Sequence, residues 1–476
     1  MSVSTAFAWP CLIGGQEVWG DSTLEVTYPF TGEVVGTAPL LGSHEVRRAL
    51  DLAAATRVRL DRYERSQVLE RIAHEIAHHG EDLARLITRE SGLALKDTRH
   101  EVSRAADVFR FAGREALRDD GEVYANDVSE IGRPRRGFTM REPVRLVAAI
   151  TPFNHPLNQV AHKLAPAIAV GAPIVIKPSE KTPLAGLWLA RAALDAGYPE
   201  NALAVVTTDP EPFLDEVLAD ERAELVTFTG SVAVGREIAE RAGYRRTVLE
   251  LGGNDPLLVL ADADVGVAAN LALAGATRNS GQRCTAVKRV LADRSLAEPL
   301  VERIAANAAK LRVGDPLNDD TDIGTLIDEA AAATVSRRVE SAVADGARLV
   351  FGGERDGALL VPPVLDGVFT QSELVREETF GPAVPVIAVD GLDEAIVVAN
   401  GTSYGLSAGV VSNHLPSILR CVHELRCGTV NVGEVPGYRT EQTPFGGVKA
   451  SGTGAKEGVV EAMRGMTTVK LVTLPW

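Results

Sequence analysis

Residues 146–177 read LVAAITPFNHPLNQVAHKLAPAIAVGAPIVIK and predict a strand, a helix and a second strand in succession. The apolar runs Leu146–Ile150 and Pro173–Lys177 are typical of buried strands, and Leu157–Val170 between them is typical of a helix. Two strands joined by a helix lie parallel in one sheet. The stretch therefore indicates an α/β fold.

The same alternation continues toward the C-terminus. Three more runs predict strands and three predict helices, namely Ala202–Val206, Leu225–Thr229 and Thr247–Leu251, and Leu184–Ala196, Phe213–Ala219 and Val232–Ala242. A second α/β run extends from near Leu257 to about Val432. Strands alternating with helices of this length are typical of parallel sheets covered on both faces.

The residues outside these runs predict strands and one long helical stretch. Leu24–Tyr28 and Glu33–Ala38 are strand-like, and helical periodicity extends over Ser43–Arg118. The basic insert Arg133–Arg141, which could form a hairpin, and the strand-like Thr467–Leu474 stand apart from the main body. Because neither piece has an obvious local partner, we expect them to pair across a subunit interface.

Composition excludes several classes of protein. The 476 residues are 45% hydrophobic and 24% charged, which is ordinary for a globular chain, and 64 acidic against 49 basic residues give a net charge of −15. A surface this negative disfavours nucleic-acid binding. No run of about 20 apolar residues that could span a membrane occurs, because even Ala165–Ile176 is interrupted by glycine and proline.

The N-terminus and the cysteines indicate a reduced compartment. The segment Met1–Trp9 carries no Lys or Arg, so we expect no secretory signal peptide. None of the cysteines, Cys11, Cys284, Cys421 and Cys427, forms a Cys-x-x-Cys pair, which argues against a disulfide framework or a zinc ribbon. We therefore expect a cytoplasmic enzyme.

His74-Glu75-Ile76-Ala77-His78 matches the zinc-protease pattern H-E-x-x-H, and a zinc hydrolase is one alternative. The helix argues against it, since both histidines lie roughly opposite the apolar stripe that contains Ile76 and so face solvent. No third histidine follows at the extended spacing, and nothing selects Glu101 as a distant ligand. We expect a solvated helix face and no metal.

The polar segment Asn279–Thr285, with the sequence NSGQRCT, predicts a loop that carries a candidate nucleophile, Cys284. The neighbouring cation Arg283 and local backbone donors would favour the thiolate. Taken alone, Cys284 is explained at least as well as a structural residue.

Two further polar residues stand where predicted strands end. Asn154 follows Leu146–Ile150, and Glu250 lies where Thr247–Leu251 stops at paired glycines. Sites in parallel sheets lie at such carboxyl ends. The amide of Asn154 could donate to a developing oxyanion, and Glu250 in a low-dielectric cleft would have a raised pKa and could act as a general base on water.

A tight turn at Gly230 and Ser231 follows the strand Leu225–Thr229. Ser231 can cap the next helix, whose N-terminus can receive a pyrophosphate. The turn lacks the G-x-G-x-x-G pattern, so alone it is a weak signal.

Seven strings in one order resemble the aldehyde dehydrogenase superfamily over nearly the whole chain. They are PFN at 152–154, KPSE at 177–180, FTGS at 228–231, ELGG at 250–253, GQRC at 281–284, EETFGP at 377–382 and PFGGVK at 444–449. The resemblance implies two Rossmann-type parallel-sheet domains and a small β bridging region. It divides the chain into an NAD-binding domain (1–126 and 142–250), a catalytic domain (251–453) and oligomerisation strands (127–141 and 467–476), and it implies a homodimer or homotetramer.

The resemblance also implies a mechanism. The thiolate of Cys284 attacks the aldehyde, while the Asn154 amide and the backbone N–H of Cys284 hold the oxyanion; one such donor contributes about 3–4 kcal/mol. Glu250 then activates water to release a carboxylic acid. A glutamate at this position favours hydrolysis, and transfer to coenzyme A is an alternative. A non-catalytic family member is a rival of another class, but such members would be expected to lose the nucleophile or the base.

For the dinucleotide, the resemblance places Lys177 and Glu180 against the adenosine ribose and Glu378 against the nicotinamide ribose. A carboxylate at 180 would repel a 2′-phosphate, so NAD is favoured over NADP, although Lys181 leaves NADP open. The other residues expected around the cofactor are Thr151, Phe153, Ser179, Gly230, Ser231, Gly252 and Phe380.

Four residues predict an anionic substrate. Arg283 precedes the nucleophile, as in family members that oxidise phosphorylated or phosphonate aldehydes, and Arg104 and Arg439 match the same subset; His155 follows Asn154 where an aromatic residue is common. One Arg–anion contact near 4 Å contributes about 4 kcal/mol before desolvation. We expect phosphonoacetaldehyde or phosphonoformaldehyde, with glyceraldehyde 3-phosphate and lactaldehyde as alternatives. Arg283 tied to a structural carboxylate and Arg104 solvated would be the other interpretation.

Overall fold

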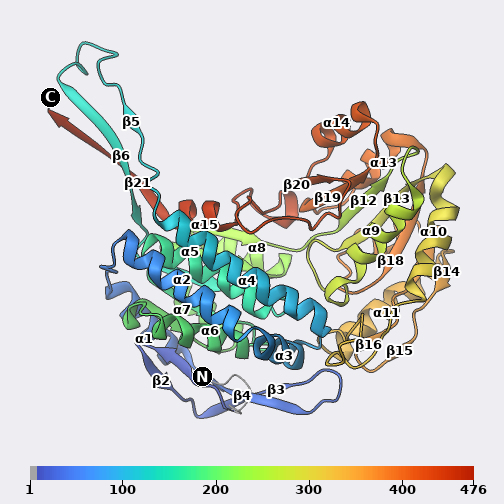
Figure 1. The fold of residues 1–476 in the computed structure, drawn as a ribbon, viewed down its shortest axis with the longest axis horizontal. Coiled ribbons are helices and arrows are strands. Elements are labelled where there is room, and N and C mark those ends of the chain that lie inside the picture. The colour runs from blue at the N-terminus through green and yellow to red at the C-terminus, as the bar shows by residue number, and fades with distance from the viewer. Residues whose placement is uncertain (1–7, 476) are drawn as a thin grey trace.

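The computed structural model describes residues 8–475, which form two sheet-bearing bodies and a projecting arm (Figure 1). Residues 1–7 and Trp476 lie outside the described residues. The first range is most of the segment in which we expect no signal peptide, and Trp476 is the end of the expected bridging region. No helix in residues 8–475 is long and apolar enough to cross a membrane.

The first body is built on a seven-stranded sheet in the order β11-β10-β7-β8-β9-β1-β2. Its strands are β1 (Cys11–Ile13), β2 (Gln16–Val18), β7 (Val147–Ile150), β8 (Ile174–Lys177), β9 (Leu203–Val205), β10 (Leu225–Thr229) and β11 (Arg246–Glu250). The five strands from β7 to β11 pair in parallel, and each lies within a residue or two of its predicted position. The chain reverses direction across the sheet between β7 and β10, and ligands of such sheets bind at that point.

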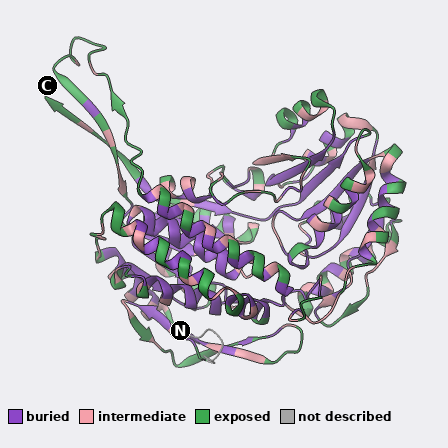
Figure 2. Ribbon diagram, in the orientation of Figure 1, coloured by how far each residue is buried: buried purple, intermediate pink, exposed green. Residues whose placement is uncertain are grey.

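Helices cover this sheet and bury the first core. They are α1 (Ser43–Ala55), α2 (Arg62–His78), α3 (Gly80–Ser91), α4 (Leu95–Ala116), α5 (Pro156–Val170), α6 (Leu184–Asp195), α7 (Pro210–Ala219), α8 (Val232–Arg241) and α15 (Val459–Gly465), with the short η1 (Glu200–Ala202). The long helical stretch predicted before residue 118 is four helices; α3 ends at Gly92, whose φ of 74° is left-handed. Purple ribbon in Figure 2 marks the buried sides of α2, α4 and α5.

The second body contains another seven-stranded sheet, in the order β14-β17-β18-β13-β12-β19-β20. Its strands are β12 (Asp255–Val259), β13 (Val287–Asp293), β14 (Arg348–Phe351), β17 (Val364–Asp366), β18 (Val384–Val389), β19 (Ser407–Val411) and β20 (Thr429–Val432). Its helices are α9 (Val265–Thr277), η2 (Arg278–Gly281), α10 (Arg294–Ala308), α11 (Glu329–Ala344), α12 (Glu373–Arg376), α13 (Gly391–Asn400), α14 (Leu415–Glu424) and η3 (Lys449–Ser451). All pairs except β14·β17 are parallel, so the expected fold of two parallel sheets is confirmed. Two hairpins, β3 (Ser22–Thr27) with β4 (Val34–Leu40) and β15 (Arg355–Asp356) with β16 (Leu359–Leu360), lie outside both sheets.

The arm is a three-stranded antiparallel sheet in the order β21-β6-β5. Its strands are β5 (Val123–Tyr124), β6 (Arg135–Pro143) and β21 (Thr467–Pro475), and β21 pairs with β6 along its whole length. The two pieces, which have no obvious local partner in the sequence, pair with each other within the chain, and their pairing across a subunit interface stays a prediction. Both strands leave the first body at the same place, where Arg141 donates to Thr467 (Figure 1). These two residues lie side by side in space although they are 326 residues apart in the sequence.

Candidate active site

Three loops meet where the two bodies face each other. Asn154, after β7, is 6% exposed, and its Nδ2 donates to the carbonyl of Gln282 at 2.8 Å. Gln282 lies two residues before Cys284. A side chain at Gly253, just beyond β11, would overlap the carbonyl oxygen of Cys284. The structure thus brings the loops of residues 154, 250 and 284 into contact.

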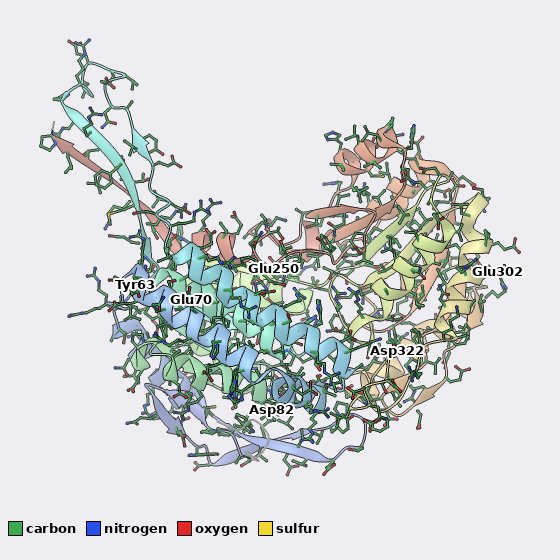
Figure 3. All side chains as sticks on the ribbon, viewed as in Figure 1. Tyr63, Glu70, Asp82, Glu250, Glu302 and Asp322 are labelled. Carbon is green, nitrogen blue, oxygen red and sulfur yellow. The ribbon has the colours of Figure 1, made fainter. Side chains whose placement is uncertain are left out.

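Glu250, the last residue of β11, is 2% exposed and lies near the middle of the molecule (Figure 3). Neither carboxylate oxygen has a hydrogen-bond partner among the described residues, and Gly446 leaves the space beside it. Burial raises the pKa of this carboxyl to about 8, against the charges of Lys163, Arg439 and Lys456. The expected raised pKa is confirmed, so near neutral pH the group gains and loses a proton readily.

Burial also raises the pKa of the Cys284 thiol, to about 12, and the carboxylates of Glu378 and Asp255 add to this rise. Arg283 and Arg439 oppose it. Arg283 thus acts in the expected direction, toward the thiolate, but desolvation of the charged sulfur outweighs the guanidinium. Near pH 7 Cys284 is a neutral thiol and must give up a proton before it can attack.

A buried amine that sequence reasoning missed lies beside Glu250. Lys163 of α5 is 1% exposed, and its Nζ donates to the hydroxyls of Thr227 and Thr229, each at 2.9 Å, and to Glu457. Burial lowers the pKa of Lys163 to about 7. The available signal was a lysine directly before the apolar run LAPAIAV (164–170). A lysine in a buried helix is rare unless it has a partner.

The residues expected around a dinucleotide lie along the switch point between β7 and β10. Thr151 follows β7, where its N–H donates to the carbonyl of Lys177 at 3.1 Å, and Ser231 caps α8 by accepting from Val234 N, as predicted. Ser231 is exposed, so the N-terminus of α8 is open to a ligand. Phe153 packs edge-on against Phe380 with ring centroids 5.8 Å apart.

Two carboxylates flank this crevice with oxygens that can accept from hydroxyls. Glu180 pairs with Lys177 at 3.1 Å; although burial opposes ionisation, this cation keeps the pKa of Glu180 below its usual value. Glu378 accepts from Gly253 N at 3.0 Å, and a side chain at Gly252 would overlap its carboxylate. An open helix N-terminus, an aromatic pair and two carboxylates fit a nicotinamide dinucleotide, with pyrophosphate on α8 and a ribose at each carboxylate.

A cavity of about 520 Å³ opens beside the Cys284 loop, and Arg104, His155 and Arg283 all line it. Its wall also includes Lys96, Asp97, His100, Arg278 and Asp322. Burial and the three arginines at 104, 283 and 439 hold the pKa of His155 well below its usual value, so this ring is neutral. The cavity is therefore cationic through its arginines rather than through His155.

Arg283 has no carboxylate within ion-pair distance among residues 8–475, and its hydrogen bond to the carbonyl of Gly437 is 3.5 Å long. Burial lowers its pKa to about 10, which still leaves the guanidinium charged near pH 7. The alternative in which a structural carboxylate neutralises Arg283 is not what the structure shows. A partly buried cation without a counterion is a binding site for an anion.

Arg439 occupies a second cavity, of about 370 Å³, where its guanidinium lies over the ring of Phe445, 4.1 Å from the centroid. Its charge still acts on His155, Cys284 and Glu250. The arginines at 104 and 283 thus share a cavity that Arg439 does not line, although Arg439 is close enough to Cys284 and Glu250 to act on their charge.

Arg104 is held by a carboxylate that the sequence did not reveal. Its Nε donates to Glu441 Oε1 at 2.5 Å, and the ring Nε2 of His162 lies 2.6 Å from Oε2. Although burial opposes ionisation, the hydrogen bond from His162 and the arginines at 104 and 439 hold the pKa of Glu441 well below its usual range. Arg104 is thus anchored by Glu441 rather than solvated.

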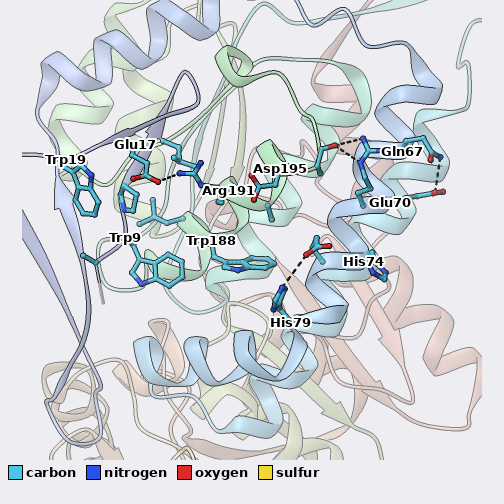
Figure 4. Close-up of a pocket in the computed structure, with 18 residues that line it drawn as sticks. Trp9, Glu17, Trp19, Gln67, Glu70, His74, His79, Trp188, Arg191 and Asp195 are labelled. Carbon is cyan, nitrogen blue, oxygen red and sulfur yellow. Dashed lines mark hydrogen bonds and ion pairs between the residues drawn. The ribbon is translucent and has the colours of Figure 1, made fainter. Parts of the chain in front are cut away.

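A larger cavity, of about 660 Å³, lies away from these residues between β1, β2, α2 and α6 (Figure 4). Trp9, Trp19 and Trp188 line it. So do His74, the first histidine of the H-E-x-x-H string, and His79, which follows that string. His74 and His78 are exposed, and their rings lie parallel with centroids 6.3 Å apart. The described residues contain no group of three or more His, Cys, Asp and Glu that could hold a metal ion.

Comparisons with known proteins agree with this arrangement. A model of the aldehyde dehydrogenase family matches residues 18–472. The chain is 36% identical over 452 residues to 3-sulfolactaldehyde dehydrogenase of Priestia megaterium (95% of this chain, 94% of the relative) and 37% identical over 458 residues to lactaldehyde dehydrogenase of Methanocaldococcus jannaschii (95% and 97%). The crystal structure of NADP-dependent glyceraldehyde-3-phosphate dehydrogenase from Bacillus halodurans C-125 complexed with NADP is similar, with a TM-score of 0.95 and 35% identity over 98% of this chain and 99% of that one.

The substitution Glu441→Gln should lower the free energy of unfolding by about 2–3 kcal/mol at pH 7, because it leaves the half-buried Arg104 without its counterion. Since the folded pKa of Glu441 is depressed, this stabilisation is present above the unfolded pKa of a glutamate, about 4.3, and is lost as pH falls below it. Urea denaturation at pH 7 measures the loss. Glu424→Gln, which breaks the exposed pair with Arg420, should cost far less, and equal losses would contradict the prediction.

Proposed function

Because this chain belongs to the aldehyde dehydrogenase family, we propose that it oxidises a small anionic aldehyde to the carboxylic acid with NAD as cofactor. Phosphonoacetaldehyde and phosphonoformaldehyde are the first candidates. Glyceraldehyde 3-phosphate and lactaldehyde are the alternatives, and the similarity to a 3-sulfolactaldehyde dehydrogenase widens the anionic class to sulfonates.

The observation that carries this proposal is the guanidinium of Arg283, which lines the 520 Å³ cavity without a counterion one residue from Cys284. Arg104, anchored by Glu441, faces the same cavity. The guanidinium of Arg283 therefore needs an anion, and it can pair with the planar or tetrahedral oxygens of a carboxylate, sulfonate or phosphonate. A neutral aldehyde would leave Arg283 desolvated and unpaired.

The chemistry follows from the groups that the fold brings together. The thiol of Cys284 gives up its proton to water, and the resulting thiolate sulfur attacks the aldehyde carbon. The carbonyl oxygen then gains negative charge, which the Nδ2 amide of Asn154 can stabilise once it leaves Gln282. A nicotinamide dinucleotide, when bound, supplies the two-electron acceptor that turns an aldehyde into an acid derivative. Glu250 takes a proton from water, which then attacks the thioester and releases the acid and the thiol.

The contacts of the crevice favour NAD over NADP. Glu180 stands where the adenosine ribose would lie, and its carboxylate would repel a 2′-phosphate. Lys181, the cation that left NADP open, is paired with Asp328 and so is not free to neutralise that phosphate. The relative crystallised with NADP shows that the family accommodates both cofactors. Rates measured with both cofactors at subsaturating concentrations decide between them.

The substrate class is tested by NADH formation with phosphonoacetaldehyde, phosphonoformaldehyde, sulfoacetaldehyde, glyceraldehyde 3-phosphate and lactaldehyde, each with and without coenzyme A. Arg283→Ala should raise KM for the anionic aldehydes by about 100-fold, because one desolvated Arg–anion contact contributes about 3 kcal/mol. KM for a neutral aldehyde should change by less than about threefold. The matched control is Arg294→Ala, which removes an exposed guanidinium far from the cavity. Equal effects on charged and neutral aldehydes would make Arg283 structural, and product that requires coenzyme A would replace hydrolysis by acyl transfer.

The pH dependence of turnover tests Glu250 as the base. Because burial raises its pKa to about 8, the carboxyl is protonated and inactive as a base below that pH. The turnover number, kcat, should therefore rise between pH 6.5 and 8.5 and then level off. Glu250→Gln should lower kcat by about 100-fold and flatten this rise. Cys284→Ala should show no turnover at any pH. A Gln variant that keeps both the rate and the pH dependence of the wild type would refute the assignment.

We also propose that the arm joins subunits, as the family resemblance implies, into a dimer or tetramer. Apolar side chains of the arm remain exposed in the part of the chain that the structure describes, including Val469, Leu471, Leu474 and Met140, which are 41–61% exposed. Leu471→Asp, placed on the outer strand β21, should lower the mass measured by light scattering to that of a smaller assembly, about 50 kDa for a monomer. Leu415→Asp, at a similarly exposed leucine on α14, is the control and should leave the mass unchanged. An unchanged mass for Leu471→Asp would argue against the arm.

A further inference from the structure

Helix α5 begins at the site without a cap of its own. Its N-cap residue is His155, which makes no capping hydrogen bond, and its first residue, Pro156, has no N–H. The ring of His155 is used elsewhere, because its Nε2 lies 2.8 Å from the amide of Asn279. The N–H groups of Leu157 and Asn158 must therefore be satisfied from outside the helix.

Glu101 of α4 supplies that cap. Its Oε1 accepts from Leu157 N at 2.9 Å and from Asn158 N at 3.0 Å, and the residue is 1% exposed. Asn154 lies three residues before Leu157. The carboxylate of Glu101 thus fixes the point at which the Asn154 loop enters its helix.

The same face of α4 holds the opposite loop. Asp97, four residues before Glu101, accepts from Asn279 N at 2.9 Å. Asn279 has a φ of 54°, a left-handed conformation that costs a non-glycine residue about 1 kcal/mol or more and needs contacts to hold it. From this conformation its Nδ2 donates to the carbonyl of Asn154 at 3.2 Å. Residues i and i+4 lie on one helix face, so the same face of α4 contacts one loop through Asp97 and the other through Glu101.

We propose that Glu101 and Asp97 are positioning residues, which set the distance between the amide of Asn154 and the sulfur of Cys284. The inference rests on the proposed function, because it takes Asn154 as the oxyanion donor and Cys284 as the nucleophile. Glu101 does not line the 520 Å³ cavity, and Asp97, which does, has one oxygen bonded to Asn279 N; both act through the loops that they hold.

The chain contains a matched control for Glu101. Glu90 of α3 is also 1% exposed and caps α6, with Oε2 accepting from Leu184 N at 2.8 Å and Oε1 from Ala185 N at 3.1 Å, whereas Glu101 uses Oε1 for both N–H groups. Helix α6 likewise has no side-chain cap of its own. Glu101→Gln and Glu90→Gln therefore make the same chemical change in the same kind of contact, and only the first contact lies next to Asn154.

The experiment compares both variants in kcat, in KM for NAD and in the rate at which iodoacetamide alkylates Cys284. Alkylation forms no oxyanion, so it reports the nucleophile without the amide of Asn154. Glu101→Gln should lower kcat about tenfold, a fraction of the 100-fold or more that loss of an oxyanion donor costs. It should leave KM for NAD and the alkylation rate within about twofold. Glu90→Gln should leave kcat within about twofold.

A double variant tests the route of the effect. In an Asn154→Ala background, Glu101→Gln should lower kcat by less than about twofold, since the amide that it positions is gone. A full tenfold loss in that background, an equal loss in Glu90→Gln, or no loss in Glu101→Gln would each overturn the proposal. Should Glu101→Gln fail to fold, Glu101→Asp, which keeps the charge and withdraws it by one methylene, takes its place with an expected loss of about threefold. A wild type that oxidises no aldehyde overturns the proposed function as well, whereas an active wild type with an unaffected variant overturns this inference alone.

Discussion

The site depends on ionisable side chains that the fold shields from water before any ligand binds. Glu250 and Lys163 are buried and Cys284 is half-buried, and desolvation is the largest cause of the pKa shift of each. It pushes the acids up and the amine down, so that a carboxyl and an ammonium group both titrate near neutral pH. A site exposed to water would leave these groups at their ordinary values, and none would exchange a proton readily near pH 7.

The fold achieves this burial by placing polar strand ends between two bodies. The carboxyl ends of β7, β10 and β11 meet at a switch point of the first sheet, and the loop that precedes β13 of the second sheet closes over them. Neither body could exclude water from these ends alone. Helix α4 belongs to the first body, yet through Asp97 it holds a residue of the second, so the spacing of the two halves is set by polar contacts as well as by apolar packing.

The sequence predicted the parts of this arrangement that depend on local pattern. The strands from β7 to β11 were predictable because buried parallel strands are short continuous apolar runs, and Cys284, Asn154 and Glu250 because each lies in a distinctive string at a strand end or loop. Glu101 and Glu441 were not, since their partners lie 56 and 337 residues away and nothing local marks a carboxylate as a cap or a counterion. The pairing of β21 with β6 was missed for the same reason, and the protonation of Cys284 because desolvation depends on the whole surrounding fold.

The separation of Arg439 from Arg283 resolves a conflict within the proposed function. Both cations favour the thiolate of Cys284, but Arg283 also faces the cavity that would receive the anion. When an anion pairs with Arg283, the charge that this residue offers to the sulfur is partly cancelled. Arg439 lies over Phe445 in another cavity, so its charge persists after the substrate binds. One arginine can then serve recognition while the other continues to support ionisation of the nucleophile, and a single arginine could not do both.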